Sequence, residues 1–98
     1  MATSSIPWKA SLSNPTRIPA NADLNDYKTE GCYYVQASGD AAAIANSPVT
    51  TEGYVLLVLR KGNLVTQILP ARTNRIYLRI EYSTGFRAWH VFEGTEVT

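Results

Sequence analysis

The stretch of sequence that decides the fold runs from residue 54 to residue 82: Tyr54-Val-Leu-Leu-Val-Leu-Arg-Lys-Gly-Asn-Leu-Val-Thr-Gln-Ile-Leu-Pro-Ala-Arg-Thr-Asn-Arg-Ile-Tyr-Leu-Arg-Ile-Glu-Tyr82. It contains three runs rich in Val, Leu, Ile and Tyr, residue types that favour β-strands. The segments between the runs, 60–63 and 70–74, hold Gly, Asn and Pro, which favour tight reversals. The pattern predicts three consecutive antiparallel strands.

The first and third runs differ in their apolar pattern. Residues 54–59 are apolar at successive positions, which indicates a central strand covered from two sides or lying between two layers. Residues 75–82 alternate, so side chains of opposite character lie on opposite faces of the strand. We expect one face to meet the core, with Ile76, Leu78, Ile80 and Tyr82, and the other to face outward, with Arg75, Tyr77, Arg79 and Glu81.

Further strands and two short helical pieces are predicted around this stretch. Residues 32–37 are predicted to form an earlier strand, and residues 87–92 a final one, reached through a turn at 83–86. An Asx cap near Asn21 predicts one or two helical turns, with Leu24 and Tyr27 facing the core. A short helical turn is expected within 39–48, ending before Pro48.

The fold class that follows is mostly β, a β-dominated α+β domain. We expect a small antiparallel sandwich or half-barrel of four to six strands with one or two short helical turns. The length of 98 residues allows one domain with a modest core. Residues 1–21, which hold three prolines, are expected to form an extended lead-in arm able to dock through Trp8 and Ile18. Residues 22–94 are the predicted domain and 95–98 a tail; we expect the chain to be a piece of a longer protein.

The net charge of +1 conceals a gradient along the chain. Residues 1–53 hold three basic and five acidic groups, which gives −2, and residues 54–98 hold six basic and three acidic, which gives +3. This bias is too weak for the basic stripe of a nucleic-acid binder. No apolar run approaches the about 20 residues that cross a bilayer. We therefore expect no nucleic-acid partner and no membrane insertion.

The sequence contains no recognisable catalytic or metal-binding motif. One cysteine and one histidine exclude a disulfide framework and a Cys/His zinc site. Cys32 lies in an apolar strand and is interpreted as a buried, inert thiol; His90 is interpreted as a strand residue facing solvent or a neighbour. The paired acids Asp23 and Asp26 are better explained as helix caps than as an acid/base pair. We expect a non-enzyme with no cofactor and no metal.

Five short segments follow one another along the chain: Ala22-Asp-Leu-Asn-Asp-Tyr-Lys-Thr-Glu-Gly-Cys-Tyr-Tyr-Val, Ala45-Asn-Ser-Pro-Val with Gly53-Tyr-Val-Leu-Leu-Val, Val65-Thr-Gln-Ile, Ile76-Tyr-Leu-Arg and Gly85-Phe-Arg-Ala-Trp. In this order they resemble the knob domain of R-type pyocin and bacteriophage tail fibres. The sequence departs from the family pattern in two places. Glu30 stands where Pro is common, and Phe86-Arg-Ala-Trp89 stands where the family has a Trp-Ser-x-Trp-like ending. Phe86 can keep a packing role at the position of the first tryptophan.

The resemblance implies a module near the distal part of a trimeric receptor-binding fibre or of a polysaccharide-degrading tailspike. Such fibres recognise lipopolysaccharide, capsule or other host-surface glycans, and some knobs act only as spacers or docking units. It therefore implies a virion tail protein, synthesised in the host cytoplasm, with bacterial surface polysaccharide and copies of its own chain, as a homotrimer, for partners. As part of a larger depolymerase it would be an accessory domain.

Two interpretations of the strand predicted at residues 75–82 and of its neighbours remain open. Sugar sites combine an exposed aromatic ring with a few fixed polar groups. The predicted ligand-binding residues are therefore Arg75, Tyr77, Arg79 and Arg87, with Glu81 and His90 beside them. The alternative is a solvated sheet surface stabilised by cross-strand pairs, in which Tyr77 and Arg79 belong to the framework and the module connects or trimerises a fibre without a glycan site.

Overall fold

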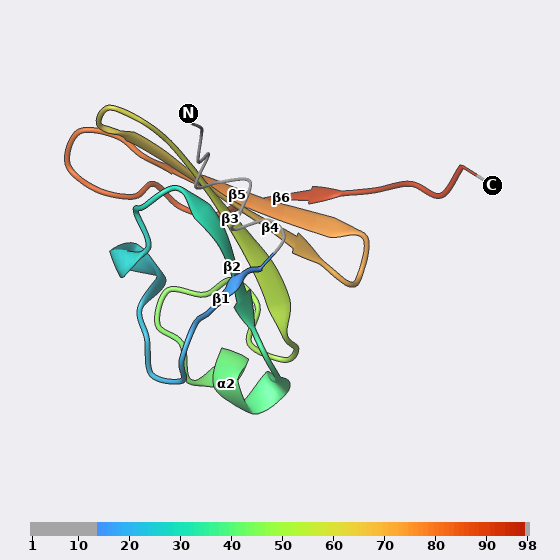
Figure 1. Ribbon diagram of the computed structural model, residues 1–98. Coiled ribbons are helices and arrows are strands. Elements are labelled where there is room, and N and C mark those ends of the chain that lie inside the picture. Colours follow the sequence, from blue (N-terminus) through green and yellow to red (C-terminus); the bar gives the residue numbers. More distant parts are fainter. Residues whose placement is uncertain (1–13, 98) are drawn as a thin grey trace, which may run out of the picture.

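The computed structural model describes residues 14–97, in which a single six-stranded sheet dominates (Figure 1). The strands lie in the sheet in their sequence order; β1 pairs parallel to β2 and every other pair is antiparallel. The predicted mostly-β class is confirmed, with one sheet rather than two packed sheets. The strands are β1 (Thr16–Arg17), β2 (Gly31–Val35), β3 (Tyr54–Lys61), β4 (Leu64–Ala71), β5 (Arg75–Glu81) and β6 (His90–Glu93).

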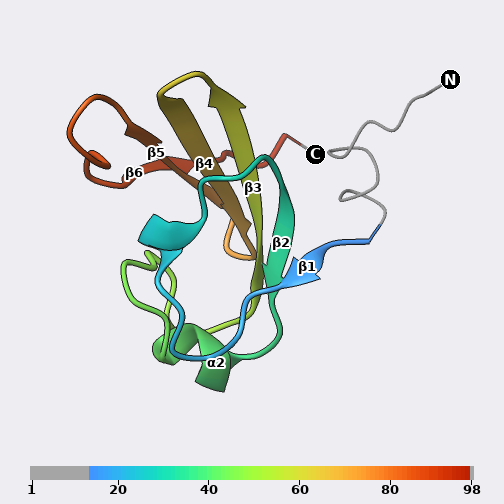
Figure 2. The same ribbon diagram turned by 60° about the vertical axis from the view of Figure 1, so that its left-hand side comes forward.

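Two short helices and their loops lie on one side of this sheet. The 3-10 helix η1 spans Leu24–Asp26, and the Asp23 side chain caps it by accepting a hydrogen bond from Asn25 N at 2.8 Å. The helix α2 spans Ser38–Ala42. Figures 1 and 2 show η1, α2 and the loop between α2 and β3 gathered together beside the sheet. Both helical pieces and the Asx cap were predicted, and neither helix within residues 14–97 is long and apolar enough to cross a membrane.

The tight turns have the backbone geometry that their residues favour. Gly62 between β3 and β4 has φ +58°, and Asn74 between β4 and β5 has φ +62°, so both adopt the left-handed region. Gly53, just before β3, is required for another reason. A Cβ there would lie 2.5 Å from Val35 O and 2.8 Å from Gln36 O, so only glycine allows this close approach of the two backbones.

The core lies on one face of the sheet, which we call the covered face. Strand residues of this face, including Leu56, Val58 and Leu69, pack with Leu24 of η1 and Ala41 of α2. Leu24 is fully buried and Tyr27 packs against the core, as predicted. The other buried residues of this core cluster are Ile18, Val35, Ile44, Val49, Tyr54 and Val65. The predicted lead-in arm is described only from residue 14, where Ile18 joins the core, and the expected docking of Trp8 lies outside the described residues.

The opposite side of strands β3 to β6, which we call the open face, remains exposed. The prediction that β3 is covered on both sides is wrong, because Val55 and Leu59 are 40% and 53% exposed. Ile76 and Phe92, which pair directly across β5 and β6, are 46% and 57% exposed. By register the open face carries Val55, Leu57, Leu59, Lys61, Leu64, Thr66, Ile68, Pro70, Ile76, Leu78, Ile80, His90 and Phe92.

The predicted orientation of β5 is also wrong. Arg79 pairs with Gln67 and Tyr77 with Leu69, so the Arg–Tyr side of β5 belongs to the covered face. Arg79 is only 5% exposed, whereas Ile76 is nearly half exposed. Alternation correctly separates the two sides of the strand, but η1 and the loop after β5 cover the polar side. Hydrophobicity alone therefore assigned the wrong side to the core.

Candidate functional site

The structure distributes the four predicted ligand-binding residues over three environments. Arg75 and Tyr77 lie at the start of β5, where they line one hollow. Arg79 lies in the interior, and Arg87 follows β5 in the loop that leads to β6. Arg87 N donates to Ile80 O at 2.9 Å, about 17 Å along the strand from Arg75 at about 3.4 Å per residue. A single site can therefore include Arg75 and Tyr77, but it does not include all four residues.

The hollow at Arg75 and Tyr77, which we call the threonine-rich hollow, has a volume of about 170 Å³. Opposite β5 it is bounded by the loop that enters β3, with Thr50, Thr51 and Glu52, and by Thr73 of the β4–β5 turn. Pro48, Val49 and Ala71 complete its lining. Hydroxyls, a carboxylate, a guanidinium and a phenol thus converge on one small opening. No local pattern signals these loop residues, because nothing in their own stretch of sequence shows that the loop folds back onto β5.

The charges at this hollow are held in place by hydrogen bonds. Arg75 Nε lies 2.9 Å from Glu93 Oε2, and this bond to the carboxylate raises the pKa of the Arg75 guanidinium. Arg75 is therefore a permanent cation. Glu52 Oε2 accepts a hydrogen bond from Arg72 N at 3.1 Å, which ties the loop to the β4–β5 turn. A cation and a carboxylate, each held by a hydrogen bond, therefore line the same hollow.

Arg79 is part of the architecture rather than of an accessible site. Its Nε donates to Gln67 Oε1 at 2.8 Å, and Gln67 Nε2 in turn donates to Leu24 O at 2.8 Å and Tyr27 O at 2.9 Å. Two buried side chains thereby attach η1 to the middle of the sheet. Burial lowers the pKa of Arg79 to about 10, and the charges of Asp23 and Glu81 partly oppose that shift.

The guanidinium of Arg79 also holds the loop 82–89. Its Cζ lies 3.9 Å from the centre of the Phe86 ring and 4.6 Å from that of Trp89. Trp89 Nε1 donates to Asn46 O at 2.9 Å. The expectation that Phe86 keeps a packing role is confirmed, since it packs against the core together with Trp89. The stacked rings replace part of the hydration that this cation loses on burial.

Arg87 remains at the surface, away from the threonine-rich hollow. Its Nη2 donates to Tyr82 O at 3.2 Å, and its Cζ lies 5.7 Å from the Tyr82 ring. Tyr82, which we expected in the core, is 61% exposed. Arg87 and Tyr82 form a small exposed pair of a cation and an aromatic ring. Neither residue lines any of the three hollows described within residues 14–97.

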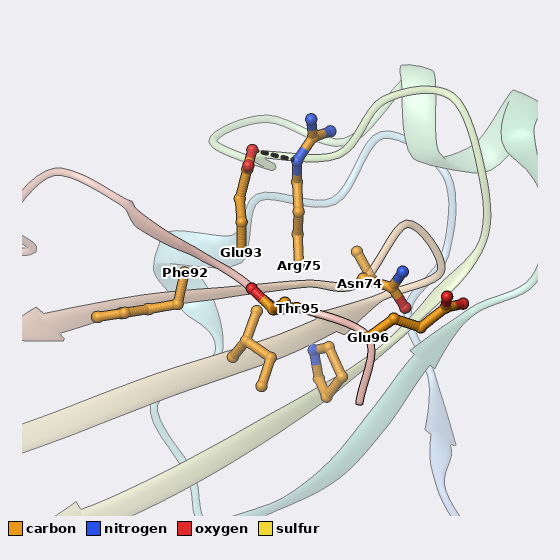
Figure 3. Close-up of a pocket in the computed structure, with 10 residues that line it drawn as sticks. Asn74, Arg75, Phe92, Glu93, Thr95 and Glu96 are labelled. Carbon is orange, nitrogen blue, oxygen red and sulfur yellow. Dashed lines mark hydrogen bonds and ion pairs between the residues drawn. The ribbon is translucent and has the colours of Figure 1, made fainter. Parts of the chain in front are cut away.

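A second and larger hollow, of about 350 Å³, lies at the β6 end of the open face; we call it the Phe92 hollow (Figure 3). Pro70, Ile76 and Phe92, which pair in one row across β4, β5 and β6, give it an apolar floor. Figure 3 shows Arg75 and Glu93 directed to the same side and joined by their ion pair, with Phe92 pointing away from them. Sequence reasoning missed this hollow because it assigned Ile76 to the core.

The cysteine and the histidine have the environments that the sequence predicted. Cys32 is 4% exposed, and burial raises the pKa of its thiol, so it carries little of the thiolate that a nucleophile needs. His90 is exposed on β6. No group of three or more His, Cys, Asp or Glu side chains within residues 14–97 could hold a metal ion.

Comparison with known proteins finds similar folds but no close relative. No family model matches the chain, and no curated protein does. An N-truncated R2-type pyocin tail fibre matches with a TM-score of 0.74 and 22% identity over 82% of this chain. A C-terminal fragment of the Pseudomonas aeruginosa R1 pyocin fibre matches with a TM-score of 0.74 and 23% identity over 82% of this chain. The fold implied by the resemblance in sequence is confirmed.

The matched fibres are much longer than this chain. The chain spans 32% of the R2-type structure and 21% of the R1 structure. The shared unit is therefore one module of a longer fibre in those proteins.

Proposed function

We propose that this chain is a non-catalytic module of a phage or phage-like tail fibre and binds host-surface polysaccharide during adsorption. The observation that carries the proposal is the fold shared with pyocin tail fibres at a TM-score of 0.74. The proposed location is the tail of the particle, after synthesis in the host cytoplasm. The bound partner is a polysaccharide of the bacterial surface.

The threonine-rich hollow is the best candidate for the sugar site. Tyr77 offers a ring edge, the Thr50, Thr51 and Thr73 hydroxyls suit sugar hydroxyls, and Arg75 suits an acidic sugar. The hollow is small, at about 170 Å³, which suits a single sugar ring rather than several. Of the four residues predicted from sequence, Arg75 and Tyr77 belong to the proposed sugar site, and Arg79 and Arg87 do not.

Glycan binding tests this proposal with a matched pair of arginine variants. A bacterial glycan array would identify a polysaccharide, and calorimetric titration would then compare the wild type with Arg75→Ala and Arg87→Ala. We expect Arg75→Ala to weaken binding by at least about tenfold, the loss of one charge-assisted contact. Arg87→Ala should leave binding unchanged. Equal losses in both variants, or no binding to any bacterial glycan, would contradict the proposal.

A second candidate function is a connector or trimerisation module of the fibre without its own glycan site. The exposed open face favours it, because Leu59, Ile76 and Phe92 are each about half exposed. Measurement of the assembly size in solution separates the trimer from other states. A module that assembles as a trimer but binds no glycan would support this candidate over the first.

A further inference from the structure

We infer that the Phe92 hollow is a second sugar subsite, which takes a sugar ring without an acidic group through the exposed ring of Phe92. The inference rests on the proposed function for its biological role. It adds to that function a separate place on the fold and a different class of sugar, because the threonine-rich hollow suits acidic sugars through Arg75.

The hollow has the size and the apolar floor of a small-molecule site. Its volume of about 350 Å³ lies at the lower end of the roughly 300–1,000 Å³ of such sites. Pro70, Ile76 and Phe92 pair in one row across three strands, which lie about 4.8 Å apart, so the row extends over about 10 Å. Phe92 is 57% exposed and Ile76 is 46% exposed, so a ligand on this floor can bury further apolar surface of both.

The walls of the hollow are fixed by interactions of the chain itself. Gly94 N donates to Asn74 O at 2.8 Å, which holds the segment after β6 against the β4–β5 turn. The ion pair of Arg75 and Glu93, at 2.9 Å, joins β5 to β6 beside this bond. Binding sites are usually preformed in this way, because ordering a loose wall would weaken the binding of a ligand.

An aromatic ring lies at one end of the hollow and polar groups lie at the other. Figure 3 shows Phe92 at one end of the residues drawn and Asn74 and Glu96 at the other, with Thr95 between them. An amide, a hydroxyl and a carboxylate can each form hydrogen bonds with sugar hydroxyls. The C–H groups on the apolar face of a sugar ring suit the negative face of an aromatic ring. A sugar is therefore the class of ligand that satisfies both ends.

The charges of the hollow select against an acidic sugar. Arg75 is the only basic residue among the described residues that line it, and its guanidinium is paired with Glu93. None of the ion pairs found within residues 14–97 includes Glu96, so the Glu96 carboxylate has no charged partner in that range. An acidic sugar would meet this carboxylate and would lose hydration without gaining a counter-charge.

Amide NMR of the full chain, titrated with methyl glycosides, tests the inference. The neutral probes are the methyl glycosides of glucose, galactose, mannose and N-acetylglucosamine, and methyl glucuronoside is the acidic control. We expect at least one neutral probe to shift the amide signals of Gly94, Thr95 and Glu96 with a dissociation constant in the millimolar range, which is ordinary for a ligand of about a dozen heavy atoms. Methyl glucuronoside should bind there at least about tenfold more weakly.

Two neighbouring residues of β6 give a matched pair of variants. Phe92 lines the hollow, whereas Val91, 49% exposed, lies on the opposite side of the strand and does not line it. We expect Phe92→Ala to raise the dissociation constant of the neutral probe by at least about tenfold, and Val91→Ala to change it by less than about threefold. Phe92→Tyr keeps an aromatic ring and should stay within about threefold of the wild type. The dispersion of the amide spectrum confirms that each variant is folded.

A third variant separates the charge of the hollow from its shape. Glu96→Gln removes the carboxylate and keeps a hydrogen-bonding side chain of the same length. We expect it to strengthen the binding of methyl glucuronoside by at least about threefold and to leave the affinity for the neutral probe within about threefold.

Several results would overturn the inference. One is that no neutral probe shifts the amides of residues 94–96 at concentrations up to about 100 mM. Others are shifts that persist unchanged in Phe92→Ala, and methyl glucuronoside binding to the wild type as tightly as the neutral probes. Indole that binds at these amides and is displaced by none of the glycosides would show that the hollow takes an apolar ligand instead of a sugar.

The outcome is separable from that of the glycan proposal. Tyr77 lines the threonine-rich hollow and not the Phe92 hollow, so Tyr77→Ala should leave the binding of the neutral probe unchanged. Neutral probes that bind at residues 94–96, without polysaccharide binding that depends on Tyr77, would remove the first site and leave this subsite. Polysaccharide binding that is lost in Tyr77→Ala, without a neutral probe binding at residues 94–96, would remove this subsite and leave the first.

Discussion

Both faces of the sheet carry apolar side chains, but the buried polar side chains of the strands lie on the covered face, within the core. The covered face buries Gln67 completely and leaves Arg79 only 5% exposed, while the open face exposes Leu59, Ile76 and Phe92. Hydrogen bonds and ring stacking compensate the buried polar pair on the covered face. The comparison teaches that which face of the sheet is buried depends on where η1 and the loops pack, and not on the hydrophobicity of the strand residues alone.

The largest effect expected from this comparison is the difference between two leucines of β3. Leu56 is fully buried on the covered face, and Leu59 is 53% exposed on the open one. We expect Leu56→Ala to lower the free energy of unfolding by about 2–5 kcal/mol, and Leu59→Ala by less than about 1 kcal/mol. Urea unfolding in the dilute, monomeric range measures both. Similar losses in the two variants would mean that something covers the open face of the monomer.

A second effect concerns the buried cation on the covered face. Arg79→Ala removes the stacking on Phe86 and Trp89 and leaves Gln67 Oε1 without its donor, so we expect a loss of about 2–4 kcal/mol in the free energy of unfolding. Arg79→Met keeps the volume without the charge and should recover at least half of that loss. Chemical denaturation compares the free energies of unfolding of the two variants. An Arg79→Ala variant as stable as the wild type would refute the stabilising role of this side chain.

The strand β5 and its surroundings show which parts of the fold can be predicted from the sequence. Local pattern correctly predicted the strands around Gly62 and Asn74, the cap at Asp23 and the buried Leu24, because turns, caps and alternation are short-range effects. It missed β1, whose two residues are too short to leave a pattern. It also wrongly placed Arg79 on the exposed side of the strand. The hydrogen bond that compensates the burial of Arg79 is accepted by Gln67, 12 positions earlier in sequence, and no local pattern shows such a pairing.

The candidate site was predictable only in part for the same reason. Arg75 and Tyr77 were found because they alternate on one strand, but the threonines opposite them come from a loop more than 20 residues earlier in sequence. The Phe92 hollow is lined by residues of β4, β5 and β6 and of the segment that follows β6. No local pattern encodes such meetings of distant segments.

A third and smaller effect is pH dependence on the covered side. Asp23 accepts hydrogen bonds from Asn46 Nδ2 and Asn25 N, and these bonds lower its pKa below the ordinary value of 3.8. A carboxyl with a lower pKa in the folded state stabilises the fold above about pH 4 and loses this contribution as the pH falls through its folded pKa. Thermal unfolding from about pH 5 to about pH 2 should show a shallower acid decline for Asp23→Asn than for the wild type. Parallel declines would contradict the assignment.

The smallest expected change in stability lies where the two faces meet, at the ion pair of Arg75 and Glu93. Both side chains are exposed, at 44% and 64%, so Glu93→Gln should change the free energy of unfolding by less than about 0.5 kcal/mol. The same variant leaves Arg75 without its carboxylate partner at the rim of the threonine-rich hollow. If that hollow binds acidic sugars, Glu93→Gln should tighten binding of an acidic polysaccharide and leave binding of a neutral one unchanged. Titration with both polysaccharides tests this prediction. Equal changes in affinity for the two would mean that Arg75 does not interact with the charge of the ligand.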